Sequence, residues 1–167
     1  GGIALRGGPP RRGEPDAEVF AELAQPGPAP AAAAASGRAP AQIFEGLRVL
    51  EIGSGAAGPV ATSYLAEHGA QVIRIESRER PDFLRELFRS PTHGLDGAAM
   101  FILLNANKQT VALNLKHPEG VALAEELVRW ADVICENYAA GVPEKLGLGP
   151  ERVRAQNPRV VMASGCL

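Results

Sequence analysis

The sequence contains few of the residues that build metal sites and disulfide frameworks. Among 167 residues there are 2 cysteines and 3 histidines. Cys135 and Cys166 fall in separate strand-like runs, so we expect buried, reduced thiols rather than a disulfide or metal pair. That expectation fits a cytoplasmic protein. His68, His93 and His117 are scattered without the spacing of metal ligands, and we expect no metal.

Charge and hydropathy exclude further classes of partner. The formal net charge is −2, which gives no reason to expect nucleic acid or an anionic membrane. No apolar run approaches the roughly 20 residues that a membrane-spanning helix needs. The sequence begins with Gly1 and Gly2, and no basic-then-apolar signal segment follows, so we expect no export.

The stretch from Leu47 to Glu76 has the clearest pattern in the sequence. Short apolar runs predict buried strands over residues 47–52 and 72–75. Pro59 is typical of the first turn of a helix, so a helix is expected between them. This order predicts a parallel βαβ unit whose helix N-terminus faces a ligand. The connecting turn contains residues that allow a sharp bend and close approach to a ligand, namely Gly53, Gly55 and Gly58.

Two nucleotide-type cofactors fit this turn. The letters GSGAAG match G-x-G-x-x-G, and Glu76 stands where a dinucleotide fold places its ribose-binding acid. The letters LEIGSG also resemble the glycine motif of S-adenosylmethionine methyltransferases. The stretch alone leaves an NAD-dependent oxidoreductase and a methyltransferase open.

The whole pattern predicts an α/β fold, a Rossmann-like layer with a mostly parallel sheet and flanking helices. A charge-dense run, residues 77–89, follows the second strand at the end where open α/β sheets bind ligands, and it contains Arg78, Arg80 and Arg85. Residues 90–100 are expected to be irregular. The remaining elements are expected as strands over residues 110–115, 132–136 and 159–163 and as helices over residues 118–131, 142–148 and 150–155.

Several blocks after residue 104 resemble one family. Asn105-x-Asn107-Lys108 followed by Leu113-x-Leu115-Lys116-x-Pro118-Glu119-Gly120 looks like the class III CoA transferases, which include formyl-CoA, carnitine and bile-acid CoA transferases and the related α-methylacyl-CoA racemase. Glu136-Asn137-Tyr138 and Asn157-Pro158-Arg159 are similar to further family blocks. Two segments depart from the family: Gly53-Ser54-Gly55 replaces a Ser-Arg or similar pair, and Glu79-Arg80-Pro81-Asp82 replaces Gly-x-Gly-Asp.

The resemblance implies three parts. Residues 43–167 are expected to be the N-terminal, CoA-binding portion of a class III CoA-transferase domain, incomplete because no helix follows the last strand. Residues 26–42, almost entirely Ala, Pro, Gly and Ser, are expected to form a linker. Residues 1–25, with a short helix expected over residues 14–23, resemble the family's C-terminal ending and are expected to be the tail of a preceding module in a tandem protein.

The resemblance also implies an activity for the parent protein: transfer of coenzyme A from an acyl-CoA to a small carboxylic acid through an aspartyl-CoA thioester. The family's nucleophilic aspartate lies beyond the last block, so no catalytic residue is assigned here and this chain alone is expected to be inactive. The implied assembly is an interlocked homodimer, or a pseudo-dimer of tandem modules, with no nucleic acid and no membrane. A racemase-type isomerase and an inactive CoA-binding module stay open.

Carried over residue by residue, the resemblance implies contacts with coenzyme A from several loops. The turn after the first strand touches the nucleotide end, and Arg78 suits the 3′-phosphate or pyrophosphate. Surface charge is the alternative role for Lys145 and Arg85, and a core position is the alternative for Leu113. The full set is Ala56, Ala57, Gly58, Arg78, Arg85, Leu113, Lys116, Asn137, Tyr138 and Lys145.

Overall fold

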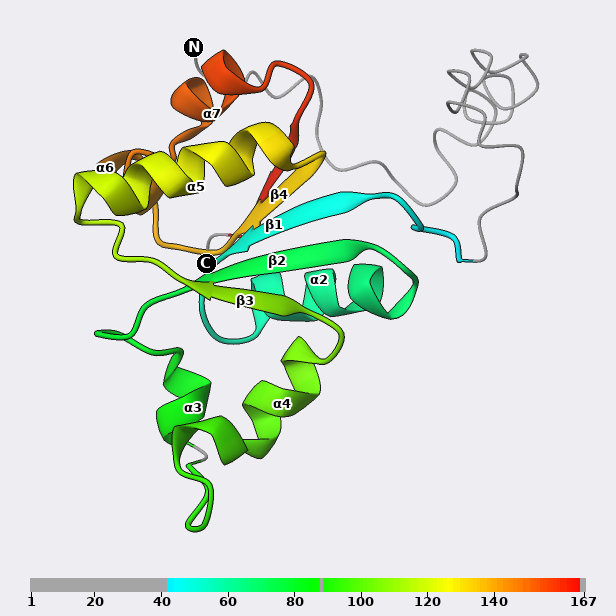
Figure 1. Ribbon diagram of the computed structural model, residues 1–167, viewed down its shortest axis with the longest axis vertical. Coiled ribbons are helices and arrows are strands. Elements are labelled where there is room, and N and C mark those ends of the chain that lie inside the picture. The colour runs from blue at the N-terminus through cyan, green and yellow to red at the C-terminus, as the bar shows by residue number, and fades with distance from the viewer. Residues whose placement is uncertain (1–41, 88, 166–167) are drawn as a thin grey trace, which may run out of the picture. The chain divides into compact units, whose positions relative to one another are not determined.

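A five-stranded parallel sheet forms the centre of the fold, in the order β3-β2-β1-β4-β5 (Figure 1). The computed structural model describes residues 42–87 and 89–165. The α/β fold predicted from the sequence is confirmed, whereas the expected tail, most of the linker and Cys166 lie outside the described residues. The strands are β1 (Arg48–Ile52), β2 (Gln71–Glu76), β3 (Gln109–Ala112), β4 (Val133–Glu136) and β5 (Val161–Ser164).

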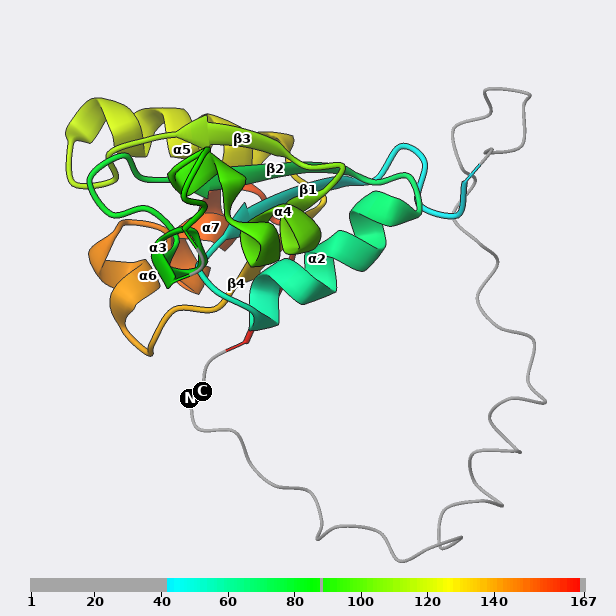
Figure 2. The ribbon, with the colours of Figure 1, turned by 90° about the horizontal axis from the view of Figure 1, so that it is seen from below.

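Helices cover both faces of the sheet, with α2 and α5 on opposite sides (Figure 2). Proline lies in the first turn of α5, α6 and α7, where its missing N–H costs no hydrogen bond. No helix of the described part is long and apolar enough to cross a membrane. The helices are α2 (Ala57–Glu67), α3 (Phe83–Leu87), the 3-10 turn η1 (Leu95–Gly97), α4 (Ala99–Asn105), α5 (Pro118–Trp130), α6 (Val142–Lys145) and α7 (Pro150–Gln156).

Alternation along the strands separates two packing regions. Leu50 and Ile134 face α5 and α7 and join a fully apolar core that includes Val128 and Val153. The residues next to them in the strands face α2, where Val49 and Val72 pack near one end of the sheet. Because side chains in a strand point alternately to opposite faces, each strand contributes to both regions.

The third strand is shorter than the expected range of residues 110–115. β3 ends at Ala112, and the last hydrogen bond to β2 runs from the Leu113 amide to the Glu76 carbonyl at 2.9 Å. Beyond that point β2 offers no partner, because it also ends at Glu76. The Asn114 side chain then accepts a hydrogen bond from the Lys116 amide at 3.0 Å and turns the chain toward α5. Residues 113–116 are therefore a loop at the carboxyl edge of the sheet.

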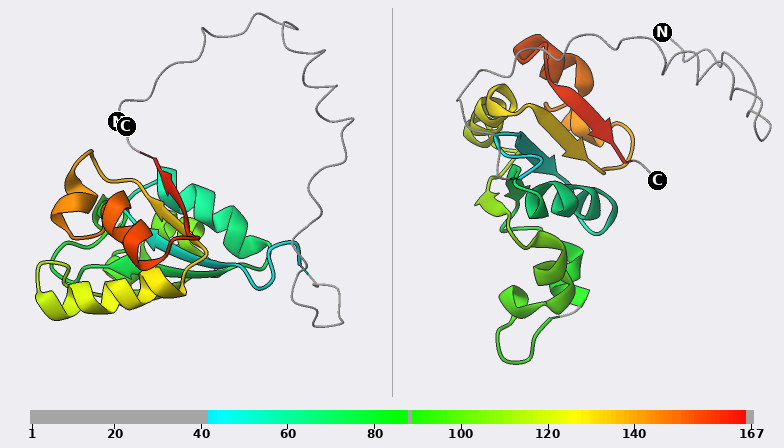
Figure 3. Two further views of the ribbon diagram at one scale, coloured as in Figure 1. Left: turned by 90° about the horizontal axis from the view of Figure 1, so that it is seen from above. Right: turned by 90° about the vertical axis from the view of Figure 1, so that its right-hand side faces the viewer.

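Helix α4 was not expected, since residues 90–100 were predicted to be irregular and no helix was predicted for residues 101–105. Its sequence is apolar on every side, so no helical periodicity marks it. The buried ring of Phe101 packs with Leu84 and Ala98, which holds α4 against α3. Together α3 and α4 form a lobe beside the β3 edge of the sheet, drawn in green (Figure 3, right).

Candidate functional site

The sheet order reverses between β1 and β4, and open parallel sheets bind ligands at the carboxyl ends of such strands. Asn137, just after β4, reaches across this point and donates a hydrogen bond to the Ser54 carbonyl at 2.7 Å. It also accepts one from the Ser54 amide at 3.1 Å. A Cβ at Gly53 would lie 1.9 Å from the Asn137 Oδ1, so a larger residue there would displace the Asn137 side chain. Gly53 therefore makes room for Asn137, which ties the turn after β1 to the end of β4.

The loop after β2 braces the same turn from the other side. Gly55 has a φ of +80°, a conformation that favours glycine, and an added Cβ would lie 2.4 Å from the Phe83 ring. The Gly55 amide donates to the Asp82 carboxylate at 2.9 Å. The Leu84 amide donates to the other oxygen of Asp82 at 2.8 Å, so this one carboxylate holds two loops together.

A cavity of about 330 Å³ opens at the carboxyl edge of the sheet. Residues that follow each of the strands β1 to β4 contribute to its wall, so sequence segments far apart converge on it. The cavity therefore lies where the topology predicts a ligand site. The residues most important to its chemistry are Ser54, Arg74, Arg80, Leu113, Lys116 and Tyr138.

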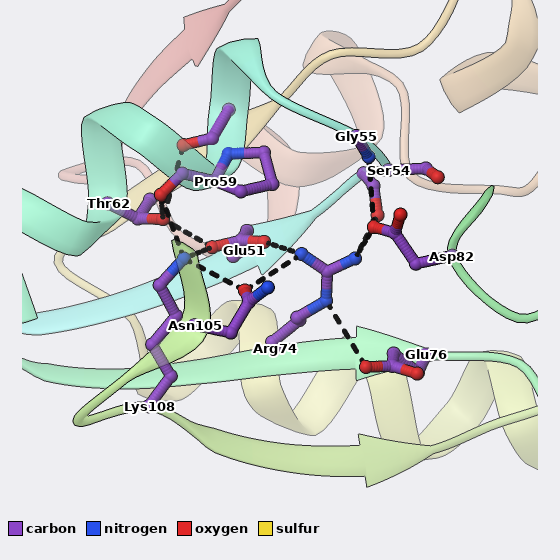
Figure 4. Close-up of polar contacts among 12 residues, drawn as sticks. Glu51, Ser54, Gly55, Pro59, Thr62, Arg74, Glu76, Asp82, Asn105 and Lys108 are labelled. Atoms are coloured by element: carbon purple, nitrogen blue, oxygen red, sulfur yellow. Dashed lines mark hydrogen bonds and ion pairs between the residues drawn. The ribbon is translucent and has the colours of Figure 1, made fainter. Parts of the chain in front are cut away.

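A cluster of buried charges lies under α2, beside the cavity (Figure 4). Glu51 of β1 has 0% of its surface exposed and forms ion pairs with Arg74 and with Lys108, the latter at 2.8 Å. Its carboxylate also accepts a hydrogen bond from the Thr62 hydroxyl on α2. Glu51 therefore connects α2, β2 and the turn before β3 through a single carboxylate.

Lys108 is a buried cation whose donors are all used. Its ammonium donates to Glu51, to the Pro59 carbonyl at 2.9 Å and to the Asn105 amide oxygen at 3.1 Å. Burial lowers the pKa of Lys108, and the nearby Glu51 carboxylate opposes that lowering. The contacts assign Lys108 to holding α2 on the sheet, with no donor left for a ligand.

Arg74 belongs both to the charged cluster and to the wall of the cavity. Its guanidinium forms ion pairs with Glu51 and Asp82, and its Nε lies 3.5 Å from a Glu76 oxygen. It also donates to the Gly53 carbonyl at 3.2 Å. Arg74 and Asp82 both line the cavity, so the shape of the wall depends on this pair.

Arg85 lies at the junction with the α3–α4 lobe. It forms a bidentate ion pair with Glu76, with both distances at 3.0 Å, and a second pair with Asp96 at 3.0 Å. Its guanidinium carbon stands 3.5 Å from the centroid of the Phe101 ring. These contacts join the lobe to the end of β2, and Arg85 does not line the cavity.

Tyr138 forms part of the cavity wall after β4. Its amide donates to the Glu136 carboxylate at 2.9 Å, which fixes the loop. Burial raises the pKa of the Tyr138 phenol, so the hydroxyl stays neutral at physiological pH. The residue offers a ligand an aromatic face and an uncharged hydroxyl.

A second, more open cavity of about 650 Å³ adjoins the first, and Leu115, Lys116 and Leu146 line both. Lys145 and Arg152 lie on its wall, and Arg152 forms an ion pair with Glu125. The two cavities are therefore adjacent, and Lys116 lies in the wall that they share.

The structure distributes the ligand residues predicted from the sequence over several places. Leu113, Lys116 and Tyr138 line the first cavity, and Lys145 joins Lys116 on the second. Arg78 is exposed and lines neither. Ala56, Ala57 and Gly58 form the turn and the start of α2. Asn137 bonds to Ser54, and Arg85 forms an ion pair with Glu76. Their contacts with a ligand remain predictions.

Sequence reasoning missed the charged cluster, and it placed Arg80 at the ligand edge without including it among the residues that contact coenzyme A. A signal for the cluster was present, because Glu51 and Arg74 each interrupt an otherwise apolar strand. A charge in a buried strand requires a buried partner. No comparable signal separated Arg80 from Arg78, because a loop has no periodicity that shows which side chain faces a ligand.

Residues 44–165 match the profile of CoA-transferase family III. The chain belongs to this family. The resemblance inferred from the motifs is thereby confirmed.

Known members of CoA-transferase family III are similar over most of this chain. The succinyl-CoA–D-citramalate CoA-transferase of Chloroflexus aurantiacus is 37% identical over 128 residues, which are 76% of this chain and 31% of that protein. The formyl-CoA:oxalate CoA-transferase of Streptomyces coelicolor is 37% identical over 124 residues, 74% of this chain and 30% of that protein. The chain therefore spans less than a third of the length of these relatives.

A solved structure agrees with the fold. The crystal structure of a CAIB/BAIF family protein from Brucella suis matches with a TM-score of 0.67 and 32% sequence identity. The match covers 74% of this chain and 33% of that one.

Proposed function

We propose that this chain is the CoA-binding part of a CoA-transferase that moves coenzyme A from an acyl-CoA to a carboxylic acid. The observation that carries the proposal is the convergence of Leu113, Lys116 and Tyr138 on one cavity at the carboxyl edge of the sheet. These residues come from two loops and offer an apolar side chain, a cation and an aromatic ring. That combination suits a ligand with anionic phosphates and an uncharged arm.

The adjoining cavities suit a long ligand. Coenzyme A has a phosphorylated nucleotide at one end and a thiol on a flexible arm at the other. Within residues 42–87 and 89–165, Lys116 and Lys145 have no ion-pair partner, and both line the second cavity. We place phosphate groups beside these lysines.

The proposed reaction proceeds through covalent intermediates. An aspartate of the complete enzyme attacks the thioester carbonyl of the donor acyl-CoA, expels CoA thiolate and forms a mixed anhydride. The thiolate then attacks the aspartyl carbonyl, which releases the donor acid and leaves an aspartyl-CoA thioester. The acceptor carboxylate attacks that thioester, and the same two steps in reverse order give the new acyl-CoA and free aspartate.

The buried carboxylates of this chain are unsuited to that nucleophilic role. Glu51, Glu76 and Asp82 are each held in an ion pair with an arginine, and the buried Glu136 carboxylate accepts a hydrogen bond from the Tyr138 amide. A nucleophile in such a pair would lose a buried contact at every turnover. We therefore propose that the nucleophile is supplied from outside these residues and that this chain alone exchanges no coenzyme A.

The contacts of Glu76 count against an NAD-dependent oxidoreductase. Both of its oxygens accept hydrogen bonds from Arg85, so the carboxylate is not offered to a ribose. A racemase-type isomerase or an inactive module would use the same CoA site. An activity assay of the parent protein separates those possibilities from a transferase.

Isothermal titration of the 167-residue chain tests the binding proposal. We expect CoA to bind and NADH and S-adenosylmethionine not to bind. Lys116→Ala should weaken CoA binding about tenfold, the loss for a hydrogen bond to a charged group. Arg154→Ala, an exposed cation of α7 that lines neither cavity, is the matched control and should leave binding unchanged. No binding of CoA to the wild-type chain, or binding of NADH in its place, would overturn the proposal, and measurable CoA exchange would overturn the nucleophile assignment.

A further inference from the structure

Three cations and three anions line the first cavity, and half of them are held in ion pairs inside the protein. Arg74 and Asp82 form a buried ion pair in its wall, and Glu76 is held by Arg85. These groups compensate each other and present little net charge to a ligand. The remaining charged groups of the lining lie in the loops after β2 and β3: Glu79, Arg80 and Lys116.

Hydrogen bonds fix the loop after β2 in one shape. The Ser77 hydroxyl accepts hydrogen bonds from the amides of Glu79 and Arg80, each at 3.2 Å. The Glu79 carboxylate accepts one from the Asn114 side chain at 3.3 Å, which links this loop to the loop after β3. The turn is therefore set by local bonds and tied to the segment that carries Lys116.

This shape separates two arginines that are two positions apart in the sequence. Both arginines are exposed, but Arg80 lines the cavity together with Lys116, whereas Arg78 lines neither cavity. Within residues 42–87 and 89–165, neither Arg80 nor Lys116 has an ion-pair partner. With the Glu79 carboxylate counted, these two cations leave one net positive charge on the two loops beside the cavity.

We propose that Arg80, rather than Arg78, is the guanidinium that binds a phosphate group of coenzyme A, with Lys116 on the opposite loop. The inference rests on the proposed function, because it assigns a residue within the same site. A guanidinium binds phosphate oxygens through paired N–H donors, which adds geometric specificity to charge. The phosphate belongs either to the diphosphate or to the 3′-phosphate of the ligand.

Titration of the 167-residue chain with CoA compares Arg80→Ala with Arg78→Ala. The two variants remove the same side chain from the same exposed loop, so equal unfolding midpoints serve as the folding control. Arg80→Ala should weaken CoA binding about tenfold or more, and Arg78→Ala should stay within about twofold of wild type. Arg80→Lys, which keeps the charge but not the paired donors, should fall between them.

Two shorter ligands identify the phosphate. Dephospho-CoA lacks the 3′-phosphate, and pantetheine lacks every phosphate. If Arg80→Ala weakens the binding of dephospho-CoA as much as the binding of CoA, Arg80 binds the diphosphate. If only the binding of CoA is weakened, Arg80 binds the 3′-phosphate. Both results support the proposal, with pantetheine binding unaffected in each.

The proposal is overturned if Arg80→Ala binds CoA as wild type does, if Arg78→Ala is equally weakened, or if pantetheine loses the same factor. In those cases wild-type CoA binding is intact, so the proposed function stands. A wild-type chain that fails to bind CoA overturns both.

Discussion

Leu50 and Glu51 are neighbours in β1, each has 0% of its surface exposed, and they face opposite sides of the sheet. Leu50 joins an apolar core with Ile134 and Val128 under α5. Glu51 joins ion pairs with Arg74 and Lys108 under α2. One face of the sheet is thus covered by apolar contact alone, and the α2 face combines an apolar cluster around Val49 and Val72 with the paired charges of Glu51.

The two faces differ in what they specify. Apolar burial is non-directional and tolerates small shifts between helix and sheet. Ion pairs and hydrogen bonds require particular distances and angles, and their net stabilisation is small because burial of charge is costly. The charged face reaches the cavity through Arg74 and Asp82, whereas the apolar core includes no ion pair. We infer that the charged face sets the geometry of the ligand edge.

The largest expected effect comes from removing Glu51. Glu51→Ala leaves Arg74 and Lys108 without their shared carboxylate and should cost about 3–5 kcal/mol in denaturant unfolding. Without Glu51, the pKa of Lys108 should fall further below its ordinary value of 10.5. The unfolded chain then binds more protons than the folded chain below pH 10.5, so the deficit should shrink as pH rises toward that value. A deficit independent of pH would show that Lys108 does not depend on Glu51.

Leu50→Ala tests the apolar face at the adjacent position. Truncation of a buried leucine should cost about 2–4 kcal/mol through lost burial and the cavity left behind. No charge changes, so its unfolding free energy should follow the wild-type pH profile at a constant offset. CoA affinity measured by titration should stay at the wild-type value. A large loss of affinity would contradict the division between the faces.

Asp82→Asn tests the point where the charged face meets the cavity. The amide cannot accept hydrogen bonds from Gly55, Leu84 and Arg74 with both of its terminal atoms. The expected cost is about 2 kcal/mol, the range for a lost hydrogen bond to a charged group. Because the Gly55 turn loses an anchor, CoA binding should weaken as well, in contrast to Leu50→Ala. Unchanged affinity with reduced stability would limit Asp82 to a role in folding.

The smallest loss of stability is expected at the other end of β1. There Arg48 and Asp132 form a carboxylate–guanidinium ion pair that is partly exposed to solvent. Asp132→Asn should cost less than about 1 kcal/mol because solvent screens the pair. The hydrogen bond from Arg48 lowers the pKa of Asp132 from its ordinary value of 3.8. That contribution is present above pH 3.8 and is lost as pH falls through the lowered pKa, so wild type and variant should converge in acid. A constant difference across acid unfolding curves would contradict this assignment.

Much of the fold was predictable because the strands are apolar runs and three of the described helices, α5, α6 and α7, have proline in their first turn. The exceptions have physical causes. Helix α4 is apolar on all sides, so its existence depends on packing of Phe101 rather than on a pattern. The end of β3 depends on where β2 stops offering hydrogen bonds, which a single segment does not reveal.

The site was predictable where motifs carry residue identity and not where loop shape decides. The motifs pointed to Leu113, Lys116 and Tyr138, and the cavity brings these together. The family motifs also predicted that Arg78 contacts a phosphate of coenzyme A, whereas the arginine of this loop that lines the cavity is Arg80. The Ser77 turn decides which arginine lines the wall, and loop residues have no repeat from which that direction could be read.

The amino-acid sequence alone determined the parallel sheet, the glycine turn and membership in CoA-transferase family III. Each of these shows in short apolar runs or motifs whose residues are neighbours in the sequence. Tertiary structure alone decided that Gly53 accommodates Asn137, that Glu51 pairs with Lys108, and that the loops after β2 and β3 meet around one cavity. Those contacts join segments separated by up to 84 residues, and only the packed sheet brings them within hydrogen-bonding distance.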